Sequence, residues 1–206
     1  MEETQKILNE INFIKEFYRK LIDILPSFSI LDEELLPYGL KPHTRSISWI
    51  VEQVINQQSK KNAEKLGVKD VVFDLPDTSL HDCIITDLNG DKHYVNIKAH
   101  NADGKENKND IAAVEKLHTQ YLNDDDYNLF YACLGIHFDN VNISFDKNYL
   151  EVFSAQFLPI YVNPRNDKIQ ALYKHEPQIR SRQEFLRLLE NNSKSIILNP
   201  KGTGII

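Results

Sequence analysis

The feature that most constrains the fold is a pair of apolar runs on either side of a short polar turn, in the segment HDCIITDLNGDKHYVNIKAHN at residues 81–101. Asn89 and Gly90 form the strongest short signal for a β-hairpin, because both tolerate the positive φ angles that a two-residue hairpin turn requires. The flanking runs have the length of strands, and the second alternates apolar with polar residues. The segment therefore predicts an antiparallel hairpin with one buried face and one polar face.

The polar face of the second strand gathers groups that can do chemistry. Because side chains alternate along a strand, Asn96, Lys98 and His100 share one face, and the apolar residues between them share the other. Residues equidistant from a hairpin turn lie opposite each other. Asp82, which opens the first apolar run, is therefore expected across from about Lys98. The hairpin predicts a carboxylate, an amide and an amine in one place.

The rest of the chain predicts helices and further strands. Residues 3–25 and 46–67 repeat apolar side chains at steps of three and four, which indicates amphipathic helices. The other expected elements are, in chain order, a helix over 108–123, a long buried strand over 128–138, strands over 141–146 and 150–162, and a helix over 181–192 that opens with a capping box of Ser181 and Glu184. This order predicts a single domain over residues 1–206 of the α/β or α+β class, with a mixed central sheet flanked by helices.

Charge and composition exclude some classes of protein. The net charge of −6 argues against a protein that coats nucleic acid by bulk charge, but not against one with basic side chains only along a groove. Two cysteines, Cys83 and Cys133, are too few for a disulfide framework, so a reducing cytoplasm is expected. No stretch approaches the ~20 apolar residues that span a bilayer, and the acidic start differs from a secretory signal, so no membrane association is expected.

The oxygen atoms of Asp82 and Asn96 suit a hard cation. Mg²⁺ takes oxygen ligands and keeps several waters, so a carboxylate and an amide oxygen can hold it beside a phosphate. Lys98 can then orient or deprotonate an attacking water, or stabilise charge that develops on the phosphate. The group is a candidate for metal-dependent hydrolysis of a phosphodiester.

This stretch resembles the PD-(D/E)xK nuclease superfamily, in which an acidic residue opens a central strand and an acid-x-Lys follows on the next strand. Asp82 matches the first acid and Lys98 the lysine, whereas Asn96 stands where the family normally has Asp or Glu. Glu52, on the preceding helix, matches a glutamate that many members carry. The resemblance covers roughly residues 46–135 and implies a restriction-endonuclease-like fold.

The resemblance also implies an activity. It implies a type II restriction endonuclease that cuts double-stranded DNA with Mg²⁺, or with Mn²⁺ as a substitute, and leaves 5′-phosphate and 3′-hydroxyl ends. Glu52, Asp82 and Asn96 are then the metal ligands, and together with Lys98 they form the catalytic set. Cutting both strands of a palindrome calls for two-fold symmetry, so a homodimer is expected, with the helical segment 1–40 as a candidate interface.

Basic and amide side chains are candidates for DNA contacts, mainly within residues 140–180. The candidates are Lys41, His43, Thr44 and Arg45 in KPHTRS, Lys105 and Lys108 in GKENKN, and Asn163, Arg165, Asn166, Lys168, Gln170, Lys174 and His175 in NPRNDKIQALYKH. Runs of this kind also occur on ordinary solvated surfaces, and that alternative stays open.

Asn96 leaves alternatives for the function. Its amide is neutral, so the missing charge has to come from Glu52 or another acid such as Asp110, or else the protein is a catalytically weak or inactive DNA-binding or assembly subunit. A repair or junction-resolving nuclease is a third hypothesis. Asp77 competes for the role of first acid, but it lies in a turn signal, whereas Asp82 opens a strand.

The remaining polar and aromatic residues also have simple interpretations. Asp82 and Lys98 can be no more than an exposed cross-strand ion pair. The spacing of His81, His93 and His100 matches no zinc motif, so they are interpreted as surface or hydrogen-bonded histidines. Trp49 is expected in the core.

Overall fold

The computed structural model describes residues 2–32, 34–38, 44–76, 78–104, 108–110, 114–162, 169–172 and 176–195. The chain divides into two compact units. Unit 1 consists of Met1–Leu8, Glu106–Leu129 and Phe153–Ile206, and unit 2 of Asn9–Lys105 and Phe130–Val152. The single domain expected over residues 1–206 stays a prediction.

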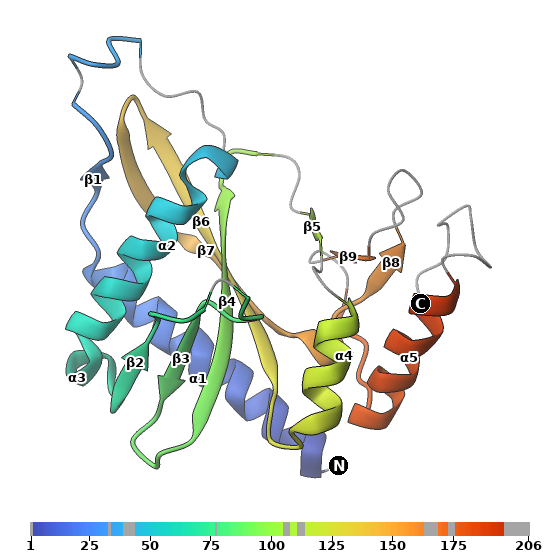
Figure 1. The fold of residues 1–206 in the computed structure, drawn as a ribbon. Helices are drawn as coiled ribbons and strands as arrows, with labels where there is room; N and C mark the ends of the chain where they lie inside the picture. The colour runs from blue at the N-terminus through green and yellow to red at the C-terminus, as the bar shows by residue number, and fades with distance from the viewer. Residues whose placement is uncertain are drawn as a thin grey trace. The chain divides into compact units, whose positions relative to one another are not determined.

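Unit 2 is built on a six-stranded sheet with the order β1-β7-β6-β4-β3-β2. The strands are β1 (Phe28–Ser29), β2 (Asp70–Val72), β3 (Cys83–Thr86), β4 (Lys92–Asn101), β6 (Leu129–Asp139) and β7 (Asn142–Ser154). The pairs β1–β7, β2–β3 and β3–β4 are antiparallel, whereas the arrows of the neighbours β4 and β6 point the same way in Figure 1. The sheet is therefore mixed, and the predicted combination of a mixed sheet with helices is confirmed.

The β3–β4 hairpin forms as predicted, but its register differs. Cys83 pairs with Val95 and Thr86 with Lys92, so the turn spans residues 87–91. The Asp87 carboxylate accepts the backbone N–H groups of Asn89 and Asp91, both at 2.9 Å, and only Gly90 within the turn has a positive φ. This longer turn shifts the pairing, so Asp82 is level with Asn96. The expected position across from Lys98 was wrong by two residues.

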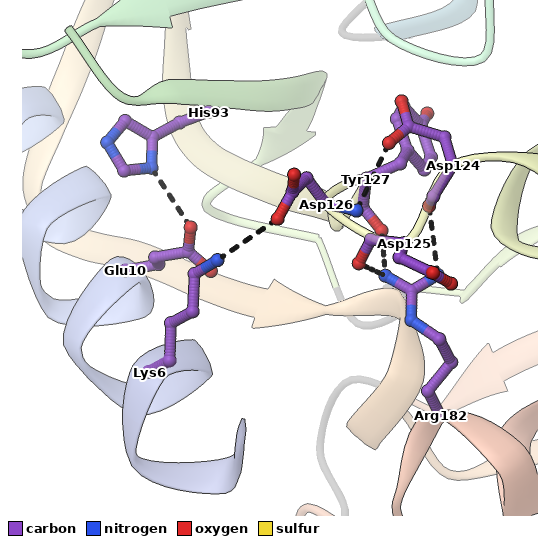
Figure 2. A network of polar contacts seen from close by, with 8 residues as sticks. All are labelled: Lys6, Glu10, His93, Asp124, Asp125, Asp126, Tyr127 and Arg182. Atoms are coloured by element: carbon purple, nitrogen blue, oxygen red, sulfur yellow. Dashed lines mark hydrogen bonds and ion pairs between the residues drawn. The ribbon is translucent and has the colours of Figure 1, made fainter. Parts of the chain in front are cut away.

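The helix α1 (Glu2–Ile24) confirms the first predicted helix, and within unit 2 it buries Ile14, Phe17 and Leu21. It also approaches β4 of the same unit, where Glu10 Oε1 lies 3.6 Å from the Nδ1 atom of the buried His93 (Figure 2). A hydrophobic face of this kind is what fixes an amphipathic helix in place, because packing stabilises a helix more than its intrinsic propensity does.

The second predicted helix is divided into α2 (Thr44–Lys61) and α3 (Ala63–Leu66), and it ends at Gly67, which has a φ of 78°. The buried stripe of α2 is Ile47, Val51 and Ile55. Trp49 was expected in the core, but its side chain is 70% exposed. It lies two residues from Ile47 and from Val51, about 200° around the helix from each, so it points away from the stripe.

The strand β6 is buried over most of its length, as predicted for residues 128–138. Asn140 (φ 56°) and Val141 connect it to β7. The two strands expected over 141–146 and 150–162 are instead one long strand, β7, then a short 3₁₀ helix η1 (Ala155–Phe157) and β8 (Ile160–Val162). The Ser154 side chain caps η1 by accepting the N–H of Gln156, which ends the strand at this point.

Unit 1 contains a three-stranded antiparallel sheet with the order β5-β9-β8, where β5 is Lys108–Asp110 and β9 is Ile169–Leu172. The helix expected over 108–123 is shorter, because residues 108–110 pair as β5 and α4 covers Val114–Asn123. The terminal helix is confirmed as α5 (Arg182–Ser195). Its predicted capping box is present, with Ser181 N donating to Glu184 Oε2 at 2.7 Å.

Arg182, the first residue of α5, fastens the turn that follows α4. Its guanidinium donates to the backbone oxygens of Tyr121, Asp124, Asp125 and Tyr127, at distances of 2.6–3.2 Å. Figure 2 shows Arg182 with the last three of these residues. The rings of Tyr121 and Phe185 pack edge to face between the two helices, 5.1 Å apart.

In the part of the chain that the structure describes, none of the helices has the length and apolar composition that a membrane span requires.

Candidate active site

Asp82 is held against β4 by hydrogen bonds on both sides. Its N–H donates to Val95 O at 2.8 Å, and its Oδ2 accepts the N–H of Ile97 at 2.7 Å. Burial raises the pKa of Asp82, while the nearby Lys98 charge and the Ile97 N–H lower it in part. The carboxylate is therefore fixed in position at the end of β3, where withdrawal from water makes its negative charge costly.

Asn96, level with Asp82, has an amide oxygen that accepts no hydrogen bond from the described residues. Its amide nitrogen donates to Leu80 O at 3.0 Å and more weakly to Asp82 Oδ1 at 3.4 Å. Because a carbonyl can only accept, the bond to Leu80 fixes which side of the amide carries the nitrogen. The Oδ1 atom is then buried, and no donor in the described part of the chain bonds to it. A buried acceptor without a hydrogen bond destabilises the folded protein by about 1–3 kcal/mol, so binding of a ligand or ion to this atom would be favourable.

Glu52, on α2, interacts electrostatically with Asp82 and Lys98. Its side chain is half-buried, and its pKa is raised to about 7, first by burial and then by the Asp82 carboxylate, while Lys98 opposes the shift. Glu52 and Asp82 thus repel each other, and a lysine acts on both. The three groups that the sequence singled out share one electrostatic environment.

Lys98 lies on the face predicted for it. Burial alternates along β4 from Lys92 to Lys98, with Val95 and Ile97 buried and Asn96 and Lys98 partly exposed. Beyond Lys98 the expected order is wrong, since Ala99 is partly exposed and His100 is buried. The ion pairs that lysines form in the described part of the chain involve Lys6, Lys60 and Lys147. Lys98 is not among them, so it does not form the cross-strand ion pair with Asp82 that was the alternative interpretation.

The sheet continues this face beyond Lys98. The buried His100 ring binds the Tyr149 hydroxyl at 3.0 Å through Nδ1, and burial together with Lys98 lowers the pKa of His100 to about 4. Cys133 on β6 is fully buried, and burial and the Glu151 charge raise its pKa, with Lys98 opposing. The Lys98 charge thus acts on His100 and on Cys133, and Cys133 in turn interacts with a further carboxylate, Glu151.

The sequence did not predict Cys133, Tyr149 or Glu151 as neighbours of the site. One signal was available, since a glycine inside a strand often marks the close approach of another group. Gly135 is such a residue, because a Cβ at this position would collide with the Tyr149 side chain. The order of β4, β6 and β7 that brings them together cannot be derived from local patterns.

The three histidines do not converge on a metal site. His81 packs against the Tyr94 ring at 5.0 Å, His93 lies near Glu10, and His100 binds Tyr149. In the described part of the chain, no three or more His, Cys, Asp or Glu residues are arranged to hold a metal ion. Glu52, Asp82 and Asn96 offer two carboxylates and one amide oxygen, so they do not form such a group.

Other predicted site residues fall elsewhere or lie outside the described residues. Arg45 and Thr44 belong to α2, Lys108 and Asp110 to β5, and Gln170 to β9. The other candidates lie outside the described residues: Lys41, His43, Asp77, Lys105, Asn163, Arg165, Asn166, Lys168, Lys174 and His175. The DNA contacts proposed for residues 140–180 therefore stay predictions.

No family model and no curated protein matches the chain. Among solved structures, the NlaIV restriction endonuclease superposes with a TM-score of 0.48 and 11% identity, over 95% of this chain and 91% of that chain. A likeness at this TM-score indicates no function, so the function has to be inferred from the side chains described above.

Proposed function

We propose that this chain is a metal-dependent endonuclease that hydrolyses phosphodiester bonds in double-stranded DNA. The observation that supports the proposal most is the Asn96 Oδ1 atom, which has no hydrogen-bond partner among the described residues and belongs to an amide that contacts Asp82. The pKa values of Asp82 and of Glu52, two carboxylates that interact electrostatically, are both raised. An acceptor without a donor and two acids that repel each other are what a hard divalent cation would relieve. The resemblance of Asp82, Asn96 and Lys98 to the PD-(D/E)xK motif adds the substrate class.

The residues fit a Mg²⁺ ion. Glu52, Asp82 and Asn96 would hold it through oxygen atoms, the donors that Mg²⁺ prefers. When bound, the ion would neutralise charge on the phosphate and lower the pKa of a water. Mn²⁺ prefers similar donors and would substitute.

The chain's own groups have separate roles in the proposed hydrolysis. Asp82 is held in place by its bonds to Ile97 and Val95, so it would fix the position of the metal ion, and through the ion that of the phosphate, relative to β4. Lys98 orients the attacking water or accepts its proton, or, as a cation, balances the negative charge that builds up on the phosphate. The water oxygen bonds to phosphorus, the bond to the 3′-oxygen breaks, and the 3′-oxygen takes up a proton from solvent, which leaves a 5′-phosphate and a 3′-hydroxyl.

The finer assignment is a type II restriction enzyme that acts as a homodimer. Two-fold symmetry would let two copies cut both strands of a palindrome, and the N-terminal segment 1–40 is the candidate interface. The second candidate is a catalytically inactive nuclease-fold subunit that binds DNA. The neutral Asn96, in a position where the family normally has an acid, favours it.

Plasmid digestion distinguishes the two candidates. The protein is incubated with plasmid DNA of known sequence and Mg²⁺ or Mn²⁺, and the fragment ends are mapped. The nuclease proposal predicts discrete fragments, and cleavage without a fixed sequence would instead indicate a repair nuclease. A mobility shift without any cutting would contradict the nuclease proposal and favour the DNA-binding subunit.

Variants assign the activity to the site. Lys98→Ala and Asp82→Ala should abolish cleavage while the protein stays folded. Lys92→Ala is the matched control, because Lys92 is an exposed lysine at the other end of the same strand. Full activity in Lys98→Ala or Asp82→Ala would remove that residue from the site.

A further inference from the structure

Trp49 is the one tryptophan of the chain, and its place in the fold is unusual for the largest apolar side chain. Its side chain is 70% exposed, whereas the residues that attach α2 to the sheet, Ile47, Val51 and Ile55, are buried. Trp49 therefore contributes little to the packing of its own helix. Isolated exposed apolar residues are common, so the position of Trp49 relative to other groups has to decide whether it has a role.

Trp49 lies one helical turn before Glu52. Residues three apart on a helix are neighbours on its surface, so the indole and the Glu52 carboxylate leave α2 side by side. Glu52 in turn interacts electrostatically with Asp82 and Lys98. Through α2, the exposed ring is thus placed next to the candidate phosphodiester site.

The side of α2 that carries Glu52 becomes more open toward the start of the helix. Further along this side, Asn56 and Ser59 are each only 1% exposed. Glu52 is half-buried, and Trp49, one turn earlier, is largely exposed. The candidate site therefore lies where this side of α2 changes from buried to exposed side chains. Trp49 is on the exposed side of that boundary, where a substrate can reach it.

We propose that Trp49 is a substrate-binding residue that stacks its indole on an unpaired nucleobase next to the phosphate held at Glu52, Asp82 and Lys98. This inference rests on the proposed function and adds that the DNA bound at the site presents a base displaced from the helical stack. An intact duplex hides the faces of its bases, whereas an unpaired or flipped base offers a π-face to an aromatic ring. Every base has such a face, so the contact strengthens binding without selecting a sequence.

The sole tryptophan makes the contact directly measurable. The wild-type protein is titrated in EDTA, so that no strand is cut, with two oligonucleotide duplexes that differ only in one unpaired base. The inference predicts saturable quenching of the tryptophan fluorescence by the duplex with the unpaired base, and much less quenching by the fully paired one. Unchanged fluorescence at saturating DNA would overturn it, as would equal quenching by both duplexes.

Variants test the same contact without relying on tryptophan emission. Binding of a fluorescein-labelled duplex with one unpaired base is followed by anisotropy, and Trp49→Ala should raise its dissociation constant about tenfold, since loss of one base–aromatic stack weakens binding to that extent. Trp49→Phe keeps a stacking ring and should stay within about threefold of wild type. Leu88→Ala is the control, because Leu88 is 74% exposed but lies in the hairpin turn at the far end of β3 and β4.

The outcomes separate this inference from the proposed hydrolysis. Equal affinities for wild type and Trp49→Ala would overturn the stacking role, whether or not the protein cuts DNA. Quenching together with the loss of affinity in Trp49→Ala would support the stacking role, even if no metal ion elicited cleavage. In that case the hydrolysis proposal fails alone.

Discussion

Proton release on metal binding is the most quantitative consequence of the candidate site. In the metal-free protein the pKa of Glu52 is about 7, because burial and the Asp82 carboxylate penalise its ionised form. A Mg²⁺ ion binds the ionised form, so each binding event has to remove the proton that Glu52 holds. The apparent affinity for Mg²⁺ should therefore rise with pH around neutrality.

The size of this effect follows from the pKa. About one Glu52 in eleven is ionised at pH 6 and about ten in eleven at pH 8, so the affinity should rise about tenfold between these values and then level off. At pH 7 binding should release about half a proton per ion. An ordinary glutamate, with a pKa near 4.3, would release almost none in this range.

Isothermal titration calorimetry measures both quantities. Mg²⁺ is titrated at pH 6, 7 and 8 in two buffers with different ionisation enthalpies, and the difference in heat gives the number of protons released. Glu52→Gln is the control, because it removes the titrating group, so any remaining affinity should not change around pH 7. An affinity that stays constant from pH 6 to 8, with no proton released, would refute the placement of Glu52 beside the metal ion.

Three further changes test other parts of the structure. The raised pKa of Glu52 means that the folded state binds more protons than the unfolded state between pH 4.5 and about 7, so stability should fall as pH rises through this window. Thermal unfolding in EDTA should show that Glu52→Gln removes this part of the fall. Asn96→Asp should increase the apparent Mg²⁺ affinity roughly tenfold, since ligand charge tunes affinity; unchanged metal dependence of cleavage would place residue 96 outside the ion's shell. Gly135→Ala should destabilise the protein by about 1–3 kcal/mol in urea unfolding, because its Cβ collides with Tyr149; wild-type stability would show that the strands adjust freely.

Local patterns predicted the parts of the fold that local physics decides. The periodic apolar residues of α1, the capping box of Ser181 and Glu184, and the alternation along β4 are all present. The shared face of Asn96 and Lys98 follows from the strand period alone. The register of the hairpin did not follow from the strand period, because the Asp87 side chain binds two backbone N–H groups and lengthens the turn. As a result, Asp82 lies opposite Asn96 and not opposite Lys98.

The parts of the site that depend on tertiary structure could not be derived in this way. The proximity of Glu52 to Asp82 was expected only from the motif resemblance, since it depends on how α2 packs on the sheet. Trp49 was misplaced because its size suggested burial, although the stripe of Ile47 and Val51 already placed it on the opposite side of the helix. The unpartnered Oδ1 of Asn96 depends on the bond to Leu80 and has no sequence signal.

The central claim is that Glu52, Asp82 and Asn96 hold a divalent cation. Crystals grown with Mn²⁺ test it most directly, through the anomalous scattering of the metal. The proposal predicts an anomalous peak within coordination distance, about 2.0–2.2 Å, of the Asn96 Oδ1 atom and of a carboxylate oxygen of Asp82. A peak elsewhere, or none beside these atoms at saturating Mn²⁺, would contradict it.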